Sequence, residues 1–275
     1  MNFITGNKFK ELADDFIDQS KPYIDLSNKP KTIFLFTDWV DAFKKDILPK
    51  IDYQFKLITH NADHGIYAKD LDLLNDSRLI QWYGMNCHVE HGKLTPIPIG
   101  IANAQWPHGD EDLLRKTISK DVPKKNRIYC NYDVKTNPLR SSILSELKGH
   151  PLVDFETKKL HQSLYWEKLA SYQYVISPPG NSEDCHRIWE SLYLGTIPIC
   201  LSSISLNTFR DLPIIVVDSW DELEDLDLIL FKYNSVKDNS LEMLDPDYWL
   251  ERMEKRCWSN EYCNSYSRTR TTLRR

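Results

Sequence analysis

The sequence predicts an α/β fold in which two Rossmann-like doubly wound domains face a cleft. Short apolar, β-branched runs alternate with stretches of helical spacing, a pattern typical of parallel sheets covered by helices. The 275 residues are enough for two compact domains. A polar stretch that contains a proline, 119–127, separates two such alternating sets. We therefore expect an N-terminal domain over residues 1–122 and a C-terminal domain over residues 123–275.

The first alternating set predicts four strands and three helices. The strands are expected at TIFLF, FKLIT, RLIQW and TPIPIGI, which are residues 32–36, 55–59, 78–82 and 95–101. Between and after them, apolar residues recur at helical spacing over 39–51, 67–75 and 109–119.

The second set begins the alternation again. Strands are expected at 127–132, 152–155, 174–178, 197–200 and 213–218. Helices are expected after Pro138 and over 160–172, 184–194, 220–231 and 246–258. We expect the last helix to pack back on the N-terminal domain. Open parallel sheets bind ligands beyond the carboxyl ends of their strands, so the site should lie on the loops that follow the strands.

Composition excludes several classes of protein. The net charge of −5 argues against nucleic-acid binding, which needs clustered lysine and arginine. No run of about 18 apolar residues occurs, and the N-terminal stretch has no apolar signal region. We expect a cytoplasmic protein without membrane insertion. Its six cysteines are expected to be reduced thiols, and its basic end, 267–275, a solvated tail.

The most informative stretch is YVISPPGNSEDCHRIWESLYLGTIPIC, residues 174–200, which predicts strand, loop, helix and strand. Gly180 permits close approach of the backbone, and the unpaired N–H groups that begin the helix suit a diphosphate. His186 and Arg187 would add positive charge there, and Glu190 would accept hydrogen bonds from a ribose diol. The spacing alone fits equally well an ordinary βαβ crossover with a surface cluster of ion pairs. We expect helix caps from Asn181, Ser182 and Asp184.

This stretch resembles the donor-binding segment of exostosin-like glycosyltransferases, which have the two-domain GT-B fold. Residues 127–143 resemble the start of the donor domain, and residues 59–66 and 86–110 resemble acceptor-domain loops, so the resemblance covers about a third of the chain. It implies an inverting transfer from a UDP-sugar to a hydroxyl of a glycan or glycoprotein acceptor. The implied donor-binding residues are Asn131, Thr136, Arg140, Ser177, Pro179, Gly180, Asn181, Asp184, His186, Arg187 and Glu190.

Length limits what the resemblance implies. The chain is much shorter than animal exostosins and shows no membrane anchor, so polymerisation of heparan type is not expected. It looks closer to compact microbial or viral relatives that transfer xylose. Acceptor binding is expected from Asn86, Asn103 and Trp106, because amides and an indole face suit sugar hydroxyls and CH surfaces.

An inverting transfer needs a general base on the acceptor side. Three residues after strands of the first domain are the catalytic candidates: Asp38, His60 and Asp63. Each has a structural alternative. Asp38 would cap the helix that begins at Trp39, His60 would be a hydrogen-bonded structural histidine, and Asp63 would be a turn residue.

Two other classes stay open. In one, Asp-x-Asp pairs at 70–72, 225–227 and 245–247 would hold a divalent metal against a diphosphate. A zinc site is a weaker form of this alternative, because the spacing of Cys87, His88, His91, Cys185 and His186 does not match a closed set of four zinc ligands. A non-catalytic protein that binds nucleotide sugars or glycans is the third possibility. The main hypothesis is an enzyme that needs neither metal nor cofactor.

Overall fold

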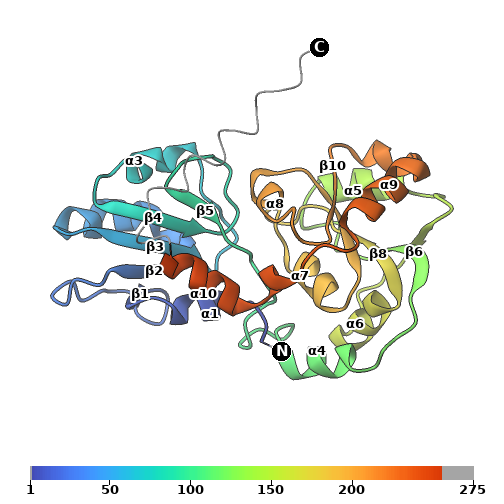
Figure 1. Cartoon of the computed structure of the whole chain (residues 1–275), viewed down its shortest axis with the longest axis horizontal. Coiled ribbons are helices and arrows are strands. Elements are labelled where there is room, and N and C mark those ends of the chain that lie inside the picture. The colour runs from blue at the N-terminus through green and yellow to red at the C-terminus, as the bar shows by residue number, and fades with distance from the viewer. Residues whose placement is uncertain (1, 256–275) are drawn as a thin grey trace, which may run out of the picture.

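Two parallel sheets of five strands each lie side by side along the molecule (Figure 1). The computed structural model describes residues 2–255. The predicted α/β class, with two Rossmann-like parallel sheets, is confirmed by the strand pairing, which is parallel throughout both sheets.

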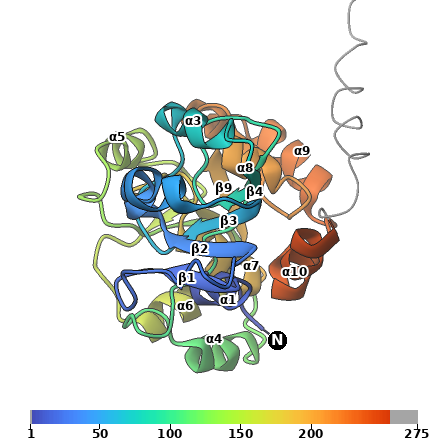
Figure 2. The ribbon, with the colours of Figure 1, turned by 90° about the vertical axis from the view of Figure 1, so that its left-hand side faces the viewer.

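The first sheet keeps its strands in chain order, β1-β2-β3-β4-β5. Figure 2 shows β1 to β4 following one another in this order. Their bounds are β1 Asp15–Ile17, β2 Thr32–Phe36, β3 Phe55–His60, β4 Leu79–Gly84 and β5 Leu94–Pro96. β2, β3 and β4 match predicted strands, whereas β5 ends at Pro96 and shares only its last two residues with the strand predicted at 95–101. β1 was not predicted, because three residues of an edge strand are too few to show a period. The helix before it, α1 Gly6–Glu11, was missed as well, since lysines and a glutamate interrupt its apolar face.

The helical stretch predicted over 39–51 is a series of short turns of changing pitch. It runs through η1 Thr37–Trp39, α2 Val40–Ala42, η2 Phe43–Ile47 and η3 Leu48–Lys50. The segment predicted at 67–75 divides into η4 Ala68–Asp70 and α3 Leu71–Leu74.

The second sheet has the order β10-β9-β8-β6-β7. Its strands are β6 Lys125–Cys130, β7 Val153–Phe155, β8 Tyr172–Ile176, β9 Ile197–Leu201 and β10 Ile215–Val217. The order reverses between β6 and β8, so connections leave these neighbouring strands in opposite directions. Such a switch point is where doubly wound sheets bind ligands. The second sheet has this reversal of strand order, whereas the strands of the first sheet follow one another in chain order.

Helices cover the second sheet near the predicted places, except that the helix predicted over 220–231 divides into a 3-10 turn and an α-helix that continues to Val236. They are α5 Leu139–Glu146, α6 Gln162–Ala170, α7 His186–Tyr193, η5 Trp220–Glu224 and α9 Leu226–Val236. A short helix, α8 Ile204–Thr208, was missed, and Ser203 caps it by accepting from the Leu206 N–H at 3.2 Å. The 3-10 turn η6 Glu242–Leu244 leads into α10 Pro246–Lys255.

One apolar core runs through both domains. Alternate residues of each strand face it, including Phe34, Ile58 and Tyr83 from the first sheet and Val175 and Cys200 from the second. Their neighbours along the strands face two further cores on the opposite sides of the sheets. Alternation is the expected behaviour of strands covered on both faces, and the shared core fixes the two sheets relative to each other.

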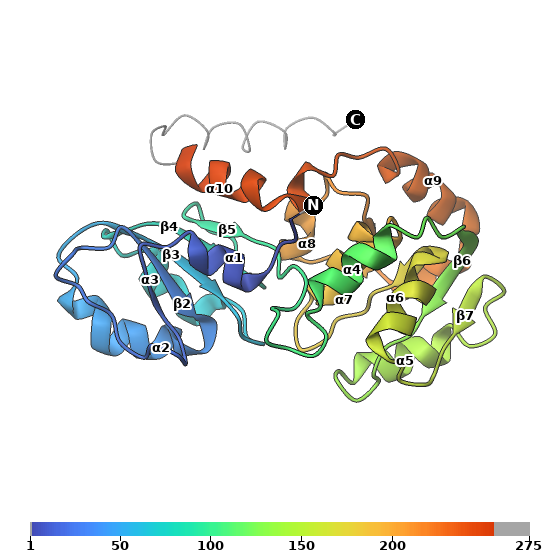
Figure 3. The ribbon, with the colours of Figure 1, turned by 90° about the horizontal axis from the view of Figure 1, so that it is seen from below.

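Two helices link the domains. α4 Glu111–Ile118 packs against α6 of the second domain. α10 crosses to the first domain and lies beside α1 (Figure 3), where Lys56 Nζ donates to the Met253 carbonyl at 2.7 Å. The predicted end of α10 at residue 258, the basic tail, Cys257 and Cys263 lie outside the described residues. Over residues 2–255, no helix has both the length and the apolar character needed to cross a membrane.

Candidate functional site

A cleft of about 1230 Å³ lies between the domains, beyond the carboxyl ends of both sheets. The first domain lines it with loops that follow β3, β4 and β5, through Ala62, Asp63, Asn86, Ile99, Pro107 and His108. The second domain lines it with the loops after β6, β7 and β8 and with the first turns of α6 and α7. The loops after β6 and β8 flank the switch point, so the cleft lies where the topology predicts it.

A buried arginine holds the loop that leads into α7. Arg140, 5% exposed, donates from Nε to the Pro179 carbonyl at 2.8 Å and from Nη1 to the Asp133 carbonyl at 3.0 Å. Its Nη2 lies 3.4 Å from the Pro178 carbonyl. A Cβ added at Gly180 would come within 3.1 Å of Arg140 Nη2, which explains the glycine. Arg140 therefore braces the loop through backbone carbonyls.

The amino end of α7 opens on the cleft without a side-chain cap. The N-cap residue is Cys185, not Asn181, Ser182 or Asp184 as predicted, and its side chain accepts no capping bond. The carboxylate of Asp184 accepts from the Ile99 N–H and from the Trp189 side chain, so it does not cap the N–H groups that begin the helix. Uncapped N–H groups and the helix dipole favour an anion at this position.

Arg187 lies in the first turn of α7 with tyrosines and a carboxylate around it. Its Cζ is 5.9 Å from the centre of the Tyr132 ring. Burial alone would lower the pKa of Arg187, but Tyr165, Cys185 and Glu190 together raise it above its usual value. Nε of Arg187 is buried and has no hydrogen-bond partner among residues 2–255. A charged donor left unpaired at a cleft wall points to an anionic ligand.

Glu190 lies one turn further along α7 and is 4% exposed. Burial raises its pKa to about 7, while Arg187, Trp166 and Tyr165 act in the opposite direction. Glu190 lines the cleft, and the negative charge of its carboxylate helps to raise the pKa of Arg187.

Hydrogen bonds join the donor-side loop to the first domain. Asp184, 2% exposed, accepts from the Ile99 N–H at 2.8 Å and from Trp189 Nε1 at 2.7 Å, and its own N–H donates to Asn86 Oδ1 at 3.1 Å. Ser182 Oγ donates to the Asp63 carbonyl at 2.8 Å. Burial raises the pKa of Asp184 to about 7. Asp184, predicted as a donor ligand, lines the cleft, and its carboxylate also ties the two domains together.

The remaining donor-side candidates divide into two groups. Asn131, Thr136 and Asn181 line the cleft. Ser177 and Pro179 do not appear in its lining: the Ser177 hydroxyl lies 3.2 Å from Cys185 Sγ, and the Pro179 carbonyl is held by Arg140.

The three catalytic candidates lie in different places. Asp63 is exposed and lines the cleft. Asp38 lies outside the cleft lining, where its Oδ1 is 2.6 Å from Nδ1 of His64. It does not act as the predicted cap, because it lies inside η1, whose N-cap is Phe36, and the N-cap of the following α2 is Trp39.

His60 is 2% exposed and has both ring nitrogens occupied. Nδ1 accepts from the Asn61 N–H at 2.7 Å, and Nε2 lies 3.1 Å from the Pro98 carbonyl. Burial lowers its pKa to about 4. The geometry fits the structural alternative for His60 and leaves no nitrogen free to take a proton.

The three residues predicted to bind the acceptor also lie in different places. Asn86 lines the cleft, and its buried Nδ2 has no partner among the described residues. Asn103 lies outside the lining and pins two segments together, donating to Asn61 Oδ1 at 2.9 Å and accepting from the Asn7 N–H at 2.8 Å. Trp106 is 57% exposed and also lies outside the lining.

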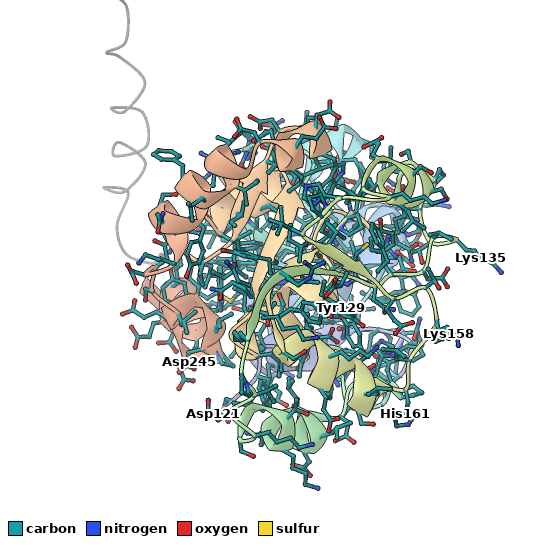
Figure 4. The ribbon with its side chains drawn as sticks, turned by 90° about the vertical axis from the view of Figure 1, so that its right-hand side faces the viewer. Asp121, Tyr129, Lys135, Lys158, His161 and Asp245 are labelled. Atoms are coloured by element: carbon teal, nitrogen blue, oxygen red, sulfur yellow. The ribbon has the colours of Figure 1, made fainter. Side chains whose placement is uncertain are left out.

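Sequence reasoning missed cleft residues that have no motif. Buried Tyr132 OH and Gln162 Nε2 have no partner within residues 2–255, and Tyr165 faces Arg187. Tyr132 directly follows β6, so its place after a strand was the available signal. Lys135, Lys158 and His161 also line the cleft and lie along one edge of the second domain (Figure 4).

The metal alternatives find little geometric support. Asp70 and Asp72 both pair with Lys44, at 3.5 and 2.8 Å, away from the cleft lining. Asp225 caps α9 by accepting from the Leu228 N–H. Cys87 is buried with Sγ on the Gly84 carbonyl. Within the described part of the chain, no three His, Cys, Asp or Glu residues form a group that would hold a metal.

No protein-family model matches this chain. Over 165 residues, 55% of the chain, it is 25% identical to the probable beta-1,4-xylosyltransferase IRX10 of Arabidopsis thaliana, of which 38% is covered. Over 177 residues, 60% of the chain, it is 24% identical to a probable glucuronosyltransferase of Oryza sativa subsp. japonica, of which 37% is covered. The chain thus spans less than two-fifths of these curated relatives. The similarity to glycosyltransferases is distant and partial, and these plant relatives give no support to a viral origin.

Two solved structures are loosely similar. An α,α-trehalose-phosphate synthase (UDP-forming) from Burkholderia vietnamiensis has a TM-score of 0.45 at 8% identity, covering 81% of this chain and 73% of that one. A UDP-GlcNAc 2-epimerase from Methanocaldococcus jannaschii has a TM-score of 0.39 at 10% identity, covering 85% and 79%. Because both likenesses are weak, the assignment of the fold depends on the strand order given above.

Proposed function

We propose that this chain is a glycosyltransferase that binds a nucleoside-diphosphate sugar in the cleft and transfers the sugar, with inversion, to a hydroxyl of a glycan acceptor. The observation that carries the proposal is Arg187, whose buried Nε points to an anionic ligand at the uncapped amino end of α7. The partial similarity to plant xylosyl- and glucuronosyltransferases supports the same reaction class. We propose UDP as the nucleotide and xylose as the sugar.

The charges of the site support a mechanism without a metal. As the sugar leaves, negative charge develops on the diphosphate. Arg187 and the first N–H groups of α7 would stabilise this charge, and Glu190 would hold Arg187 or accept from the ribose. Tyr132 beside Arg187 supplies an aromatic wall for the nucleotide. We therefore propose that no metal or other cofactor is required.

Calorimetric titration with UDP, with and without manganese, tests the proposal. We expect Arg187→Ala to weaken UDP binding at least tenfold, because charge-assisted hydrogen bonds contribute about 1.5–3 kcal/mol. Arg127→Ala is the matched control, since Arg127 pairs with Asp154 outside the cleft lining, and it should bind UDP normally. Denaturant unfolding would verify that both variants fold.

Three outcomes contradict parts of the proposal. Equal UDP affinity in wild type and Arg187→Ala would show that the donor does not bind at α7. Binding that appears only with manganese favours a metal-dependent glycosyltransferase. UDP binding without release of UDP from UDP-xylose, UDP-glucuronic acid or UDP-glucose, with glycan acceptors present, favours a non-catalytic nucleotide-sugar-binding protein.

A further inference from the structure

The first two residues of α7 face opposite walls of the cleft. His186 Nδ1 is 2.7 Å from the Gly100 carbonyl in the first domain, and its ring lies 5.9 Å from the His108 ring. Arg187 instead lies against Tyr132 of the second domain. Successive residues of a helix point about 100° apart, so α7 carries an imidazole towards one domain and a guanidinium towards the other.

The contact with Gly100 selects one tautomer of His186. A carbonyl oxygen only accepts, so Nδ1 carries the proton and donates it. In the neutral ring Nε2 then carries the lone pair, and the hydrogen bonds of residues 2–255 leave Nε2 without a partner. His186 lines the cleft. This histidine therefore offers a proton acceptor to a bound molecule, which His60 does not.

The surroundings keep His186 neutral. Burial lowers its pKa; the Gly100 carbonyl and Asp63 act to raise it, and His108 acts to lower it. On α7 itself the neighbouring charges are Arg187 and Glu190. An imidazole with a lowered pKa is ready to accept a proton at neutral pH, and a nearby carboxylate stabilises the imidazolium that forms.

We propose that His186 is the general base of the transfer, an assignment that rests on the proposed function. Nε2 takes the proton of the acceptor hydroxyl while the hydroxyl oxygen forms a bond to the anomeric carbon. The bond from that carbon to the diphosphate oxygen breaks, and its electron pair leaves with the diphosphate on the Arg187 side. The proton then passes from His186 to water.

This assignment differs from the sequence-based expectation, in which His186 holds the donor phosphates and Asp38, His60 or Asp63 is the base. The two roles are separable by experiment. A phosphate ligand contributes to UDP affinity, whereas a general base contributes to the rate of transfer and leaves nucleotide binding nearly unchanged.

The test compares His186→Asn with wild type. Asparagine Nδ2 is able to donate to the Gly100 carbonyl as Nδ1 does, but the side chain has no group equivalent to Nε2. We expect release of UDP from UDP-xylose and UDP-glucuronic acid, with water and with methyl glycosides as acceptors, to fall at least 100-fold. Calorimetric UDP affinity should stay within twofold. Added imidazole should restore part of the rate.

The pH profile adds a readout that a structural role would not move. In wild type, kcat/KM should fall on the acid side with an apparent pKa below 6.5, and this limb should disappear in His186→Asn. His91→Asn is the control, because His91 bonds only within its own loop, accepting from the Lys93 N–H, and it should keep wild-type rates.

Two results overturn the inference and leave the proposed function standing. One is a full rate of UDP release in His186→Asn. The other is a loss of UDP affinity in His186→Asn as large as in Arg187→Ala, which makes His186 a phosphate ligand. A wild-type chain that does not bind UDP contradicts the proposed function itself, and the base assignment with it.

Discussion

The two walls of the cleft differ in how far their polar groups are satisfied within the chain. On the first-domain side, the Asp63 carbonyl and Asn86 Oδ1 accept hydrogen bonds from the loop before α7, and outside the cleft lining both nitrogens of His60 and the amide of Asn103 are engaged by neighbouring residues. On the second-domain side, Arg187 Nε and Tyr132 OH are buried without a partner among residues 2–255. Asn86 Nδ2 is an exception on the first side. Buried polar groups are normally paired, so the second wall is the one that awaits a ligand.

The largest effect is expected at Arg140, which braces the second wall. Arg140→Met removes the donor to the Pro178 and Pro179 carbonyls and one of the two donors to the Asp133 carbonyl, and we expect a loss of about 3 kcal/mol in the free energy of unfolding. UDP affinity should fall at least tenfold as the loop loosens. Denaturant unfolding and calorimetry measure the two effects.

Arg127→Met is the control for this change. Arg127 also donates to a carbonyl, of Pro151, and pairs with Asp154, but at the surface. We expect it to cost less than about 1 kcal/mol. Equal effects of the two substitutions would remove the distinction between a buried brace and a surface pair.

A smaller effect is expected at Asp184, whose carboxylate joins the two domains. Asp184→Ala leaves the Ile99 N–H and Trp189 Nε1 unpaired in a buried place, which we expect to cost about 2–3 kcal/mol. Asp184→Asn should recover part of this, because its single acceptor oxygen replaces one of the two bonds. Unfolding curves that match wild type for Asp184→Ala would show that the Asp184 carboxylate adds nothing to the stability of the domain interface.

The pH dependence of stability sharpens the comparison further. Glu190 keeps its proton in the folded chain up to about pH 7, whereas an unfolded glutamic acid loses it near 4.5. Between about pH 4.5 and 7 the folded state therefore binds more protons than the unfolded state. The contribution of protonated Glu190 to the free energy of unfolding is complete below about pH 4.5 and is lost as the pH rises through about 7.

Glu190→Gln has no carboxyl proton to lose. We therefore expect its free energy of unfolding to fall less steeply than that of wild type between about pH 4.5 and 7.5, by a slope that corresponds to at most one proton. Asp184 contributes with the same sign, and His60, whose pKa is lowered, with the opposite sign. Both stay in the variant, so the difference from wild type isolates Glu190. An unchanged slope would show that Glu190 is already ionised in the folded protein.

The smallest effect is expected at Asp38. Its partner His64 is 71% exposed, and exposed pairs contribute about 0–1 kcal/mol. Asp38→Asn should therefore unfold almost as wild type and release UDP at the wild-type rate. A rate loss of 100-fold would instead place the catalytic base in the first domain.

Regular patterns made much of the fold predictable. Strands β2 to β10 follow apolar runs, and the loop between β8 and α7 follows from the Pro-Pro-Gly sequence. β1 and α1 have no such pattern, because β1 is a three-residue edge strand and charged residues interrupt α1.

The roles of single side chains were harder to predict, because they depend on partners far along the chain. The Asp184 carboxylate bonds to Ile99, 85 residues away, and His186 to Gly100, 86 residues away. A motif identifies residues that belong near a site, but which wall each one faces is decided by the packing of the other domain.

The central claim is that a nucleoside diphosphate binds between Arg187 and the uncapped start of α7. A crystal structure of the protein with UDP tests it most directly. The account predicts a diphosphate oxygen within hydrogen-bond distance of Arg187 Nε, with the first N–H groups of α7 facing the phosphates and the nucleoside against Tyr132. UDP bound elsewhere, or a cleft left empty at saturating UDP, would contradict it.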